Sequence, residues 1–231
     1  MTARRASHAN SWYSGNPAQL ERELTSWLAA ADQTSQPAKA VICPHAGYSY
    51  SGATAAFSFK QLDPNTVRTI FILGPSHHVR LSACALSQCS TYQTPLGDLN
   101  INRQINQELL DTGGAVRQYQ DCQLTSLLPG KFELMSIDAD EDEHSIEMQL
   151  PYIAKVMQPA RGNFTIVPVM VGSLSPNSEA KYGKIFAKYL QVNTLAPLIR
   201  NVRFKLSGSF GVFCHLLRLL SLGRQVPLHP L

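Results

Sequence analysis

The stretch Thr69–His78 has the sequence TIFILGPSHH, in which an apolar run is followed by Gly-Pro and then by two histidines. A short apolar run that is stopped by Gly and Pro is typical of a strand buried on both faces of a sheet. The stretch Ala40–Tyr48, AVICPHAGY, has the same order of apolar run, proline and histidine. We therefore expect two buried strands, Ala40–Cys43 and Thr69–Leu73, each followed directly by a loop that carries histidine.

Helical and strand patterns alternate around these two strands. A third strand is expected at Phe164–Val171, where Pro168 favours an edge position or a bulge because proline has no N–H for a ladder hydrogen bond. Alternating strands and helices predict an α/β fold, with a mostly parallel or mixed sheet flanked by helices. The expected helices run from Asn16-Pro17 to about Ala31, weakly over Ser51–Lys60, over Asn102–Asp111 and over Ser178–Leu190.

The composition is that of a globular protein. The chain has 231 residues, of which 44% are hydrophobic and 16% charged, and it has no apolar run long enough to cross a membrane. Five cysteines at irregular spacings predict reduced thiols and a cytoplasmic location rather than a disulfide framework. The net charge of +4 comes from residues 180–231, which contain no acidic residue. The basic residues of this segment are scattered, so they do not predict nucleic-acid binding.

The two histidine loops are the first candidates for chemistry. In open α/β sheets, ligands collect outside the carboxyl ends of the strands, which is where His45 and the pair His77-His78 lie. Neighbouring residues in an extended segment point in opposite directions, so we expect only one of His77 and His78 to reach this crevice. The simpler alternative is that each histidine is a hydrogen-bonded loop residue.

A second candidate is the acidic run Asp138–Glu147, DADEDEHSIE. Carboxylates at a helix N-terminus interact favourably with the helix dipole, which explains the run without any function. The functional alternative places His144 or Glu147 at the crevice, as a metal ligand or a proton-transfer group. Aromatic residues near the histidine loops, among them Trp12 and Tyr48, line a pocket in one interpretation and pack in the core in the other.

Four motifs together resemble the Memo family, the mediators of receptor-tyrosine-kinase-driven cell motility. Their order along the chain is the order in that family, and similarity extends from about Ala6 to Leu190. The motifs are Ala6–Tyr13 (ASHANSWY), Pro44–Gly52 (PHAGYSYSG), Ile72–His78 (ILGPSHH) and Asp140–Tyr152 (DEDEHSIEMQLPY).

The resemblance implies the fold of the class III non-haem-iron extradiol dioxygenases, with a metal crevice at the strand ends. It implies that His45 and His77 are metal ligands and that His144 lies in the pocket wall, with Tyr48, Trp12 and His78 as further pocket candidates. The implied metal is Fe or Cu. The implied role is cytosolic signalling in cell motility, with receptor tyrosine kinase pathway proteins and cytoskeletal regulators as partners. The alternative is a metal-dependent oxidoreductase.

The sequence departs from the family pattern in two places. An insertion lies near residues 114–129, and residues 191–231 form a basic tail that matches none of the family's later motifs. One of those later motifs supplies the family's third metal ligand, a cysteine. We therefore expect a Memo-like domain over residues 1–190, a poorly packed or disordered tail over 191–231, and a truncated, non-catalytic isoform.

Overall fold

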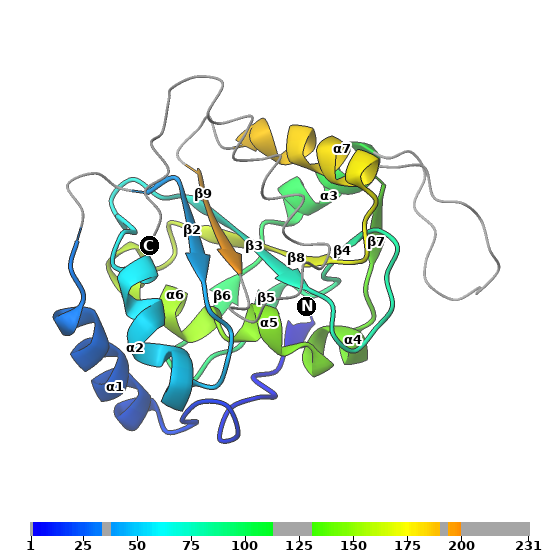
Figure 1. The fold of residues 1–231 in the computed structure, drawn as a ribbon. Helices are drawn as coiled ribbons and strands as arrows, with labels where there is room; N and C mark the ends of the chain where they lie inside the picture. The colour runs from blue at the N-terminus through cyan, green and yellow to red at the C-terminus, as the bar shows by residue number, and fades with distance from the viewer. Residues whose placement is uncertain (1, 34–37, 113–130, 190–193, 200–231) are drawn as a thin grey trace.

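A computed structural model describes residues 2–33, 38–112, 131–189 and 194–199 of the chain (Figure 1). Its main element is a six-stranded sheet with the strand order β2-β9-β3-β8-β4-β7. A small sheet of β1 (Ala3–Arg4), β5 (Thr91–Tyr92) and β6 (Leu99–Asn100) lies beside it. The strands of the main sheet are β2 (Ala40–Cys43), β3 (Thr69–Pro75), β4 (Cys84–Leu86), β7 (Phe132–Leu134), β8 (Thr165–Val171) and β9 (Thr194–Ile199).

The main sheet is mixed. β2, β9, β3 and β8 run parallel to one another, β4 is antiparallel to β8, and β7 is parallel to β4. The expected α/β class with a mostly parallel or mixed sheet is confirmed. The parallel arrangement brings the carboxyl ends of β2 and β3 to one edge of the sheet, where the two histidine loops begin.

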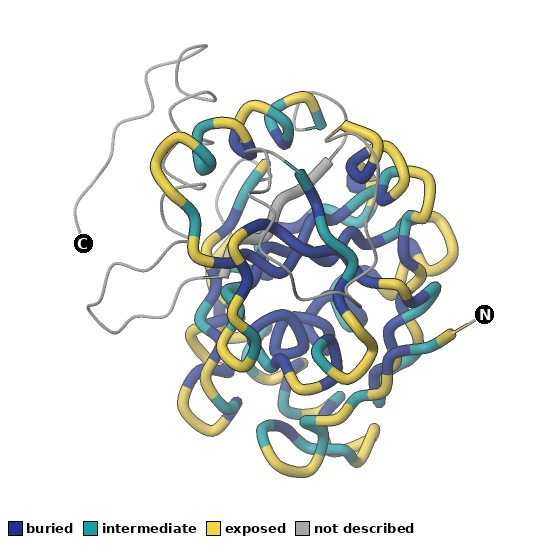
Figure 2. Tube along the Cα trace, turned by 90° about the vertical axis from the view of Figure 1, so that its right-hand side faces the viewer, coloured by how far each residue is buried: buried dark blue, intermediate teal, exposed yellow. Residues whose placement is uncertain are grey.

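Helices cover both faces of this sheet. Ile70 and Ile72 of β3 belong to one buried cluster, whereas Phe71 and Leu73 belong to another, so the two clusters lie on opposite faces. Figure 2 shows the buried sheet between more exposed outer segments. The first face packs against α2 (Tyr48–Phe59) and α6 (Leu150–Val156), with α1 (Pro17–Ala30) packed on these two helices (Figure 1). The second face packs against α3 (Arg103–Thr112) and α7 (Pro176–Ala187).

The helix α1 begins as its sequence predicts. The Asn16 side chain accepts a hydrogen bond from the backbone N of Gln19 at 3.0 Å, and Pro17 occupies the first turn. Leu20 and Leu24 are its buried residues. Within the described part of the chain, no helix is long and apolar enough to cross a membrane.

Two details of the strand predictions are wrong. β8 is an interior strand, although Pro168 favours an edge. The backbone carbonyl of Ile166 points away from β3 and accepts a hydrogen bond from the backbone N of Asn102. Backbone polar groups alternate sides along a strand, so the backbone nitrogen of Pro168, two residues later, also points away from β3. The neighbour on that side, β4, pairs only with Val169–Val171 of β8. Pro168 lies one residue outside this pairing, so its missing N–H costs no ladder hydrogen bond. β2 is not buried on both faces, because Ile42 is 38% exposed.

Strand β9 lies beyond the domain boundary expected at residue 190. It pairs with β2 on one side and with β3 on the other, so residues 194–199 are part of the sheet. The expected insertion near residues 114–129 and the remainder of the tail, residues 200–231, lie outside the described residues.

Candidate metal centre

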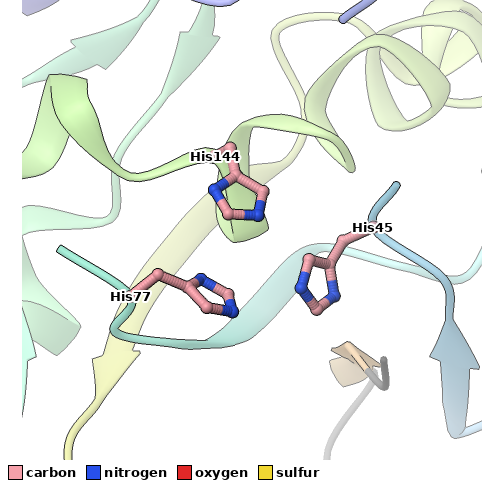
Figure 3. A group of neighbouring side chains, drawn as sticks. All are labelled: His45, His77 and His144. Carbon is pink, nitrogen blue, oxygen red and sulfur yellow. The ribbon is translucent and has the colours of Figure 1, made fainter. Parts of the chain in front are cut away.

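Three histidines from separate segments converge at the carboxyl edge of the sheet (Figure 3). His45 follows β2, His77 follows β3, and His144 begins the short helix α5 (His144–Glu147). One ligand atom from each lies within 4.8 Å of those of the other two. The distances between ring centroids are 5.3 Å for His45–His77, 5.4 Å for His45–His144 and 4.5 Å for His77–His144.

His45 is the most buried of the three, with 2% of its surface exposed. Neither of its ring nitrogens has a hydrogen-bond partner among the described residues. Burial, together with the neighbouring imidazoles of His77 and His144, lowers the pKa of His45 to about 4. A buried polar group without a partner is costly, so the two unpartnered nitrogens mark this ring as a candidate metal ligand.

His77 is held by a buried carboxylate. Its backbone N donates to Glu143 Oε2 at 2.6 Å, and its Nδ1 lies 2.9 Å from Glu143 Oε1. Burial would raise the pKa of Glu143, but hydrogen bonds from His77 and from the backbone of Ser145 lower that pKa to about 2. An ionised carboxylate on Nδ1 leaves Nε2 of His77 as the nitrogen available to a metal ion.

His144 lies between two aromatic rings. It stacks on His77 at a centroid distance of 4.5 Å and on Trp12 at 4.4 Å. Burial lowers the pKa of His144 to about 4, although the charge of Glu143 acts in the opposite direction. His144 is therefore a neutral imidazole at physiological pH, as metal coordination requires.

The acidic run forms most of two short, capped helices that place His144. Ser136 caps α4 (Ile137–Asp142) by accepting from the backbone of Ala139, and Glu143 caps α5 by accepting from the backbone of Ser145. The Ser145 hydroxyl donates to the carbonyl of Pro75 at 2.9 Å, which fixes the start of α5 against the end of β3. The predicted helix N-terminus is confirmed, and it lies at the crevice.

A second buried carboxylate, Glu147, organises the other side of the site. It accepts hydrogen bonds from Arg4 Nη1 at 2.7 Å, from Tyr13 Oη at 2.7 Å and from the backbone N of His8 at 2.9 Å. Arg4 is fully buried and also donates to Asp140. The N-terminal segment is thereby joined to the acidic run that carries His144.

The other sequence candidates are divided between the site and the core. Trp12 contacts His144, as described. His78 is exposed, and its ring lies edge-on to His144 at 6.0 Å. Tyr48 is buried and donates to the carbonyl of Met148, and its ring packs against other tyrosines and Trp27, so it belongs to the core.

Sequence reasoning assigned no role to Glu143, His8 or Arg4. Glu143 and His8 lie within the quoted motifs, but neither a run of charges nor a single histidine indicates which side chains will be in contact. Arg4 precedes every motif, and only its burial against Asp140 and Glu147 reveals it. Three imidazoles are a ligand set that suits Zn, Cu, Fe or Ni ions.

Comparisons with known proteins identify relatives of this chain. The model of the family described as "Memo-like protein" matches residues 4–205. The chain is 50% identical over 190 residues to "Protein MEMO1" of Homo sapiens and of Mus musculus, which is 82% of this chain and 58% of theirs. It is also 50% identical over 188 residues to "Protein memo-1 homolog" of Caenorhabditis elegans, 81% of this chain and 48% of that protein.

The chain thus spans 58% of the length of the mammalian relatives it matches. The family model ends at residue 205, beyond β9, so the match includes every described strand of the main sheet. Together with the identity over most of the chain, these matches show that the chain belongs to the Memo-like protein family.

Proposed function

We propose that this chain is a cytoplasmic, Memo-like signalling mediator of cell motility and cytoskeletal regulation whose histidine crevice binds a divalent transition-metal ion. His45 and His77 are the ligands that the family resemblance implies, and the geometry adds His144. The partners proposed from the resemblance are proteins of receptor tyrosine kinase pathways and cytoskeletal regulators. The free, buried thiols of Cys43, Cys84 and Cys89 are compatible with a reducing compartment.

The observation that carries the metal proposal is the state of His45. A ring with 2% exposure and two unpartnered nitrogens faces two further imidazoles whose ligand atoms lie within 4.8 Å. The metal fits this donor set because all three rings are held neutral or are oriented by a carboxylate. A bound ion supplies Lewis-acid or redox chemistry, while Glu143 orients His77 and Trp12 covers one side of His144.

The alternative function is a metal-dependent oxidoreductase that uses Fe or Cu. It is favoured by the number of ligands, since three protein ligands leave positions on the ion open to a substrate. The carboxylate of the common two-His-one-carboxylate site has no counterpart among the described ligands, because Glu143 is bonded to His77 instead. This ligand set is the reason we place binding before turnover.

The metal proposal is tested by single substitutions of the three histidines. His45→Ala, His77→Ala and His144→Ala are each expected to lower the bound metal, measured by elemental analysis after loading with Fe(II), Cu(II) or Zn(II). His78→Ala is the matched control, because His78 adjoins the cluster but is not one of the three residues whose ligand atoms converge. Parent-like affinity in all three ligand variants would exclude the crevice.

The carboxylate that orients His77 gives a further test. Glu143→Gln keeps the size of the side chain but removes the charge that holds Nδ1–H, and we expect metal affinity to fall about 10- to 100-fold. Asp142→Asn removes an equal charge from the exposed neighbouring position and is expected to leave affinity unchanged. Equal effects of the two substitutions would mean that only net charge matters.

Signalling and turnover are separated by two assays on the same preparations. If the chain is a mediator, His45→Ala reduces the migration of cells that depend on it, and the Fe(II)-loaded protein consumes no oxygen with catechol-type substrates. Oxygen consumption that requires His45 would favour the oxidoreductase. A chain without a cooperative thermal transition would instead favour the inactive isoform.

A further inference from the structure

A fourth imidazole, that of His8, adjoins the histidine cluster without belonging to it. Its ring centroid lies 6.1 Å from that of His144, and it meets Trp12 edge-on at 6.0 Å. The side chain is 14% exposed. His8 comes from the segment between β1 and α1, so a part of the chain that is remote in sequence completes this side of the crevice.

Glu147 holds His8 at two points. The backbone N of His8 donates to Glu147 Oε1 at 2.9 Å, and the ring Nδ1 lies 2.9 Å from Glu147 Oε2. Burial would raise the pKa of Glu147, but the hydrogen bond from His8, the charge of Arg4 and the hydrogen bond from Tyr13 lower that pKa to about 2. An ionised carboxylate only accepts hydrogen bonds, so in neutral His8 the proton lies on Nδ1.

This tautomer leaves a lone pair on Nε2 of His8. That nitrogen lies on the side of the ring away from Nδ1 and Glu147, and it has no hydrogen bond to the described residues. The arrangement resembles the pair of Glu143 and His77, in which a carboxylate four residues earlier in the same run holds Nδ1. Here, however, the freed nitrogen belongs to a ring that stands outside the three-histidine group.

We propose that His8 is a ligand-contacting residue, whose Nε2 accepts a hydrogen bond from an O–H or N–H group of a small molecule bound to the metal. The proposal rests on the proposed function, since the metal ion holds the other end of that molecule. Trp12 and His144 form the aromatic wall beside it. The site then selects ligands that have both a metal-binding oxygen and a nearby hydrogen-bond donor.

The test compares two ligands that differ by one donor. Acetohydroxamate chelates a metal through two oxygens and keeps an N–H, whereas N-methylacetohydroxamate chelates in the same way without it. Dissociation constants of both are measured by optical titration of the Co(II)-loaded chain, and their ratio is compared between variants. Comparing ratios cancels the size of the methyl group and any general change in metal affinity.

His8→Asn is the informative variant, because an asparagine amide can still donate to Glu147 but has no atom at the position of Nε2. We expect the preference for acetohydroxamate to fall by about threefold to tenfold, the range of one net hydrogen bond. His78→Asn is the matched control, since His78 lies at a similar distance, 6.0 Å, from His144. It should leave the preference unchanged. Thermal unfolding verifies that each variant is folded.

An unchanged ratio in His8→Asn would overturn the proposal. Cobalt content is measured before each titration, so a chain that takes up no metal counts against the proposed function and not against His8. The tautomer is determined separately, by nitrogen-15 NMR of the metal-free protein. A proton on Nδ1 of His8 is expected, and a proton on Nε2 would refute the proposal whether or not metal binds.

Discussion

Burial acts in opposite directions on the imidazole and the carboxylate of the crevice. It lowers the pKa of His45 to about 4, whereas it would raise the pKa of Glu143. Glu143 stays ionised only because it accepts hydrogen bonds from His77 and Ser145, which bring its pKa to about 2. A metal ion binds a histidine in its neutral form, and an ionised carboxylate on the other ring nitrogen orients such a histidine.

These shifts predict that acid destabilises the metal-free protein in two stages. The pKa of folded His45 and of folded His144 is about 4, below the ordinary histidine value of 6.5, so between these values the unfolded chain binds more protons. The free energy of unfolding therefore decreases as the pH falls from about 6.5 to 4. The carboxyls of Glu143 and Glu147, with folded pKa values of about 2 against 4.5, add a second loss below pH 4.5.

Urea unfolding in the presence of a chelator, between pH 7.5 and pH 4, measures the first stage. His45→Gln, which does not titrate, is expected to reduce the slope of stability against pH, whereas His78→Gln, at an exposed position, should keep the parent slope. Stability that is constant between pH 6.5 and pH 5 would show that His45 and His144 are not held neutral by the fold.

At this scale, the sequence predicts the ligand candidates better than their partners. His45 and the pair His77-His78 follow strands, and strand ends are places where ligands gather, so position made them candidates. The choice of His77 over His78 came from the family resemblance. Tyr48 had an equally good place in a motif but packs in the core. Glu143 could not be assigned because its partner His77 is 66 residues away in the chain and no local pattern joins them.

Among the secondary-structure elements, the contact of β3 with α5 decides the geometry of the crevice. Gly74 stands at the end of β3, and a Cβ there would lie 2.5 Å from Ser145 Oγ and 2.7 Å from Ile146 Cγ1. Only glycine permits this approach, which brings His144 next to His77. A second close contact lies between Gly52 of α2 and Trp27 of α1. A Cβ on Gly52 would lie 2.5 Å from the Trp27 ring, and no histidine atom is among its nearest neighbours.

These two glycines allow packing and site geometry to be separated. Gly74→Ala and Gly52→Ala are each expected to cost about 1–3 kcal/mol of stability through overpacking. Gly74→Ala should also weaken metal binding about tenfold or more, because it displaces α5 and with it His144. Gly52→Ala should not. Chemical denaturation and metal titration measure the two effects, and an equal loss of affinity in both variants would contradict this account.

The elements themselves were largely predictable. Apolar runs ended by Pro or Gly gave β2 and β3, and the helical spacing of Leu20 and Leu24 gave α1. The error at Pro168 arose because the rule against proline in interior strands assumes a long neighbour on both sides. β4 has only three residues, and its length is a tertiary feature that the sequence of β8 does not contain.

On the scale of the whole molecule, β9 joins the two strands that carry the metal-ligand candidates. β2 and β3 are not neighbours in the sheet, and β9 fills the position between them with parallel pairing on both sides. The spacing of His45 and His77 thus depends on a strand that comes after residue 190. The boundary at that residue was inferred from motifs, which record similarity in sequence and not the pairing of strands.

The position of β9 makes a prediction that two truncations can test. A chain ended after residue 205 keeps β9, whereas a chain ended after residue 190 leaves β2 and β3 without the strand between them. We expect the longer one to unfold cooperatively with the stability of the full chain, and the shorter one to lose more than about 2 kcal/mol, a large part of a typical domain's stability. Its affinity for metal should fall as well, because His45 is no longer held at a fixed distance from His77.

Thermal unfolding and metal titration of both truncations provide the comparison. Equal stability and equal metal affinity would place the end of the folded domain at residue 190 after all, and would mean that β2 is held by α2 and its loops rather than by the sheet.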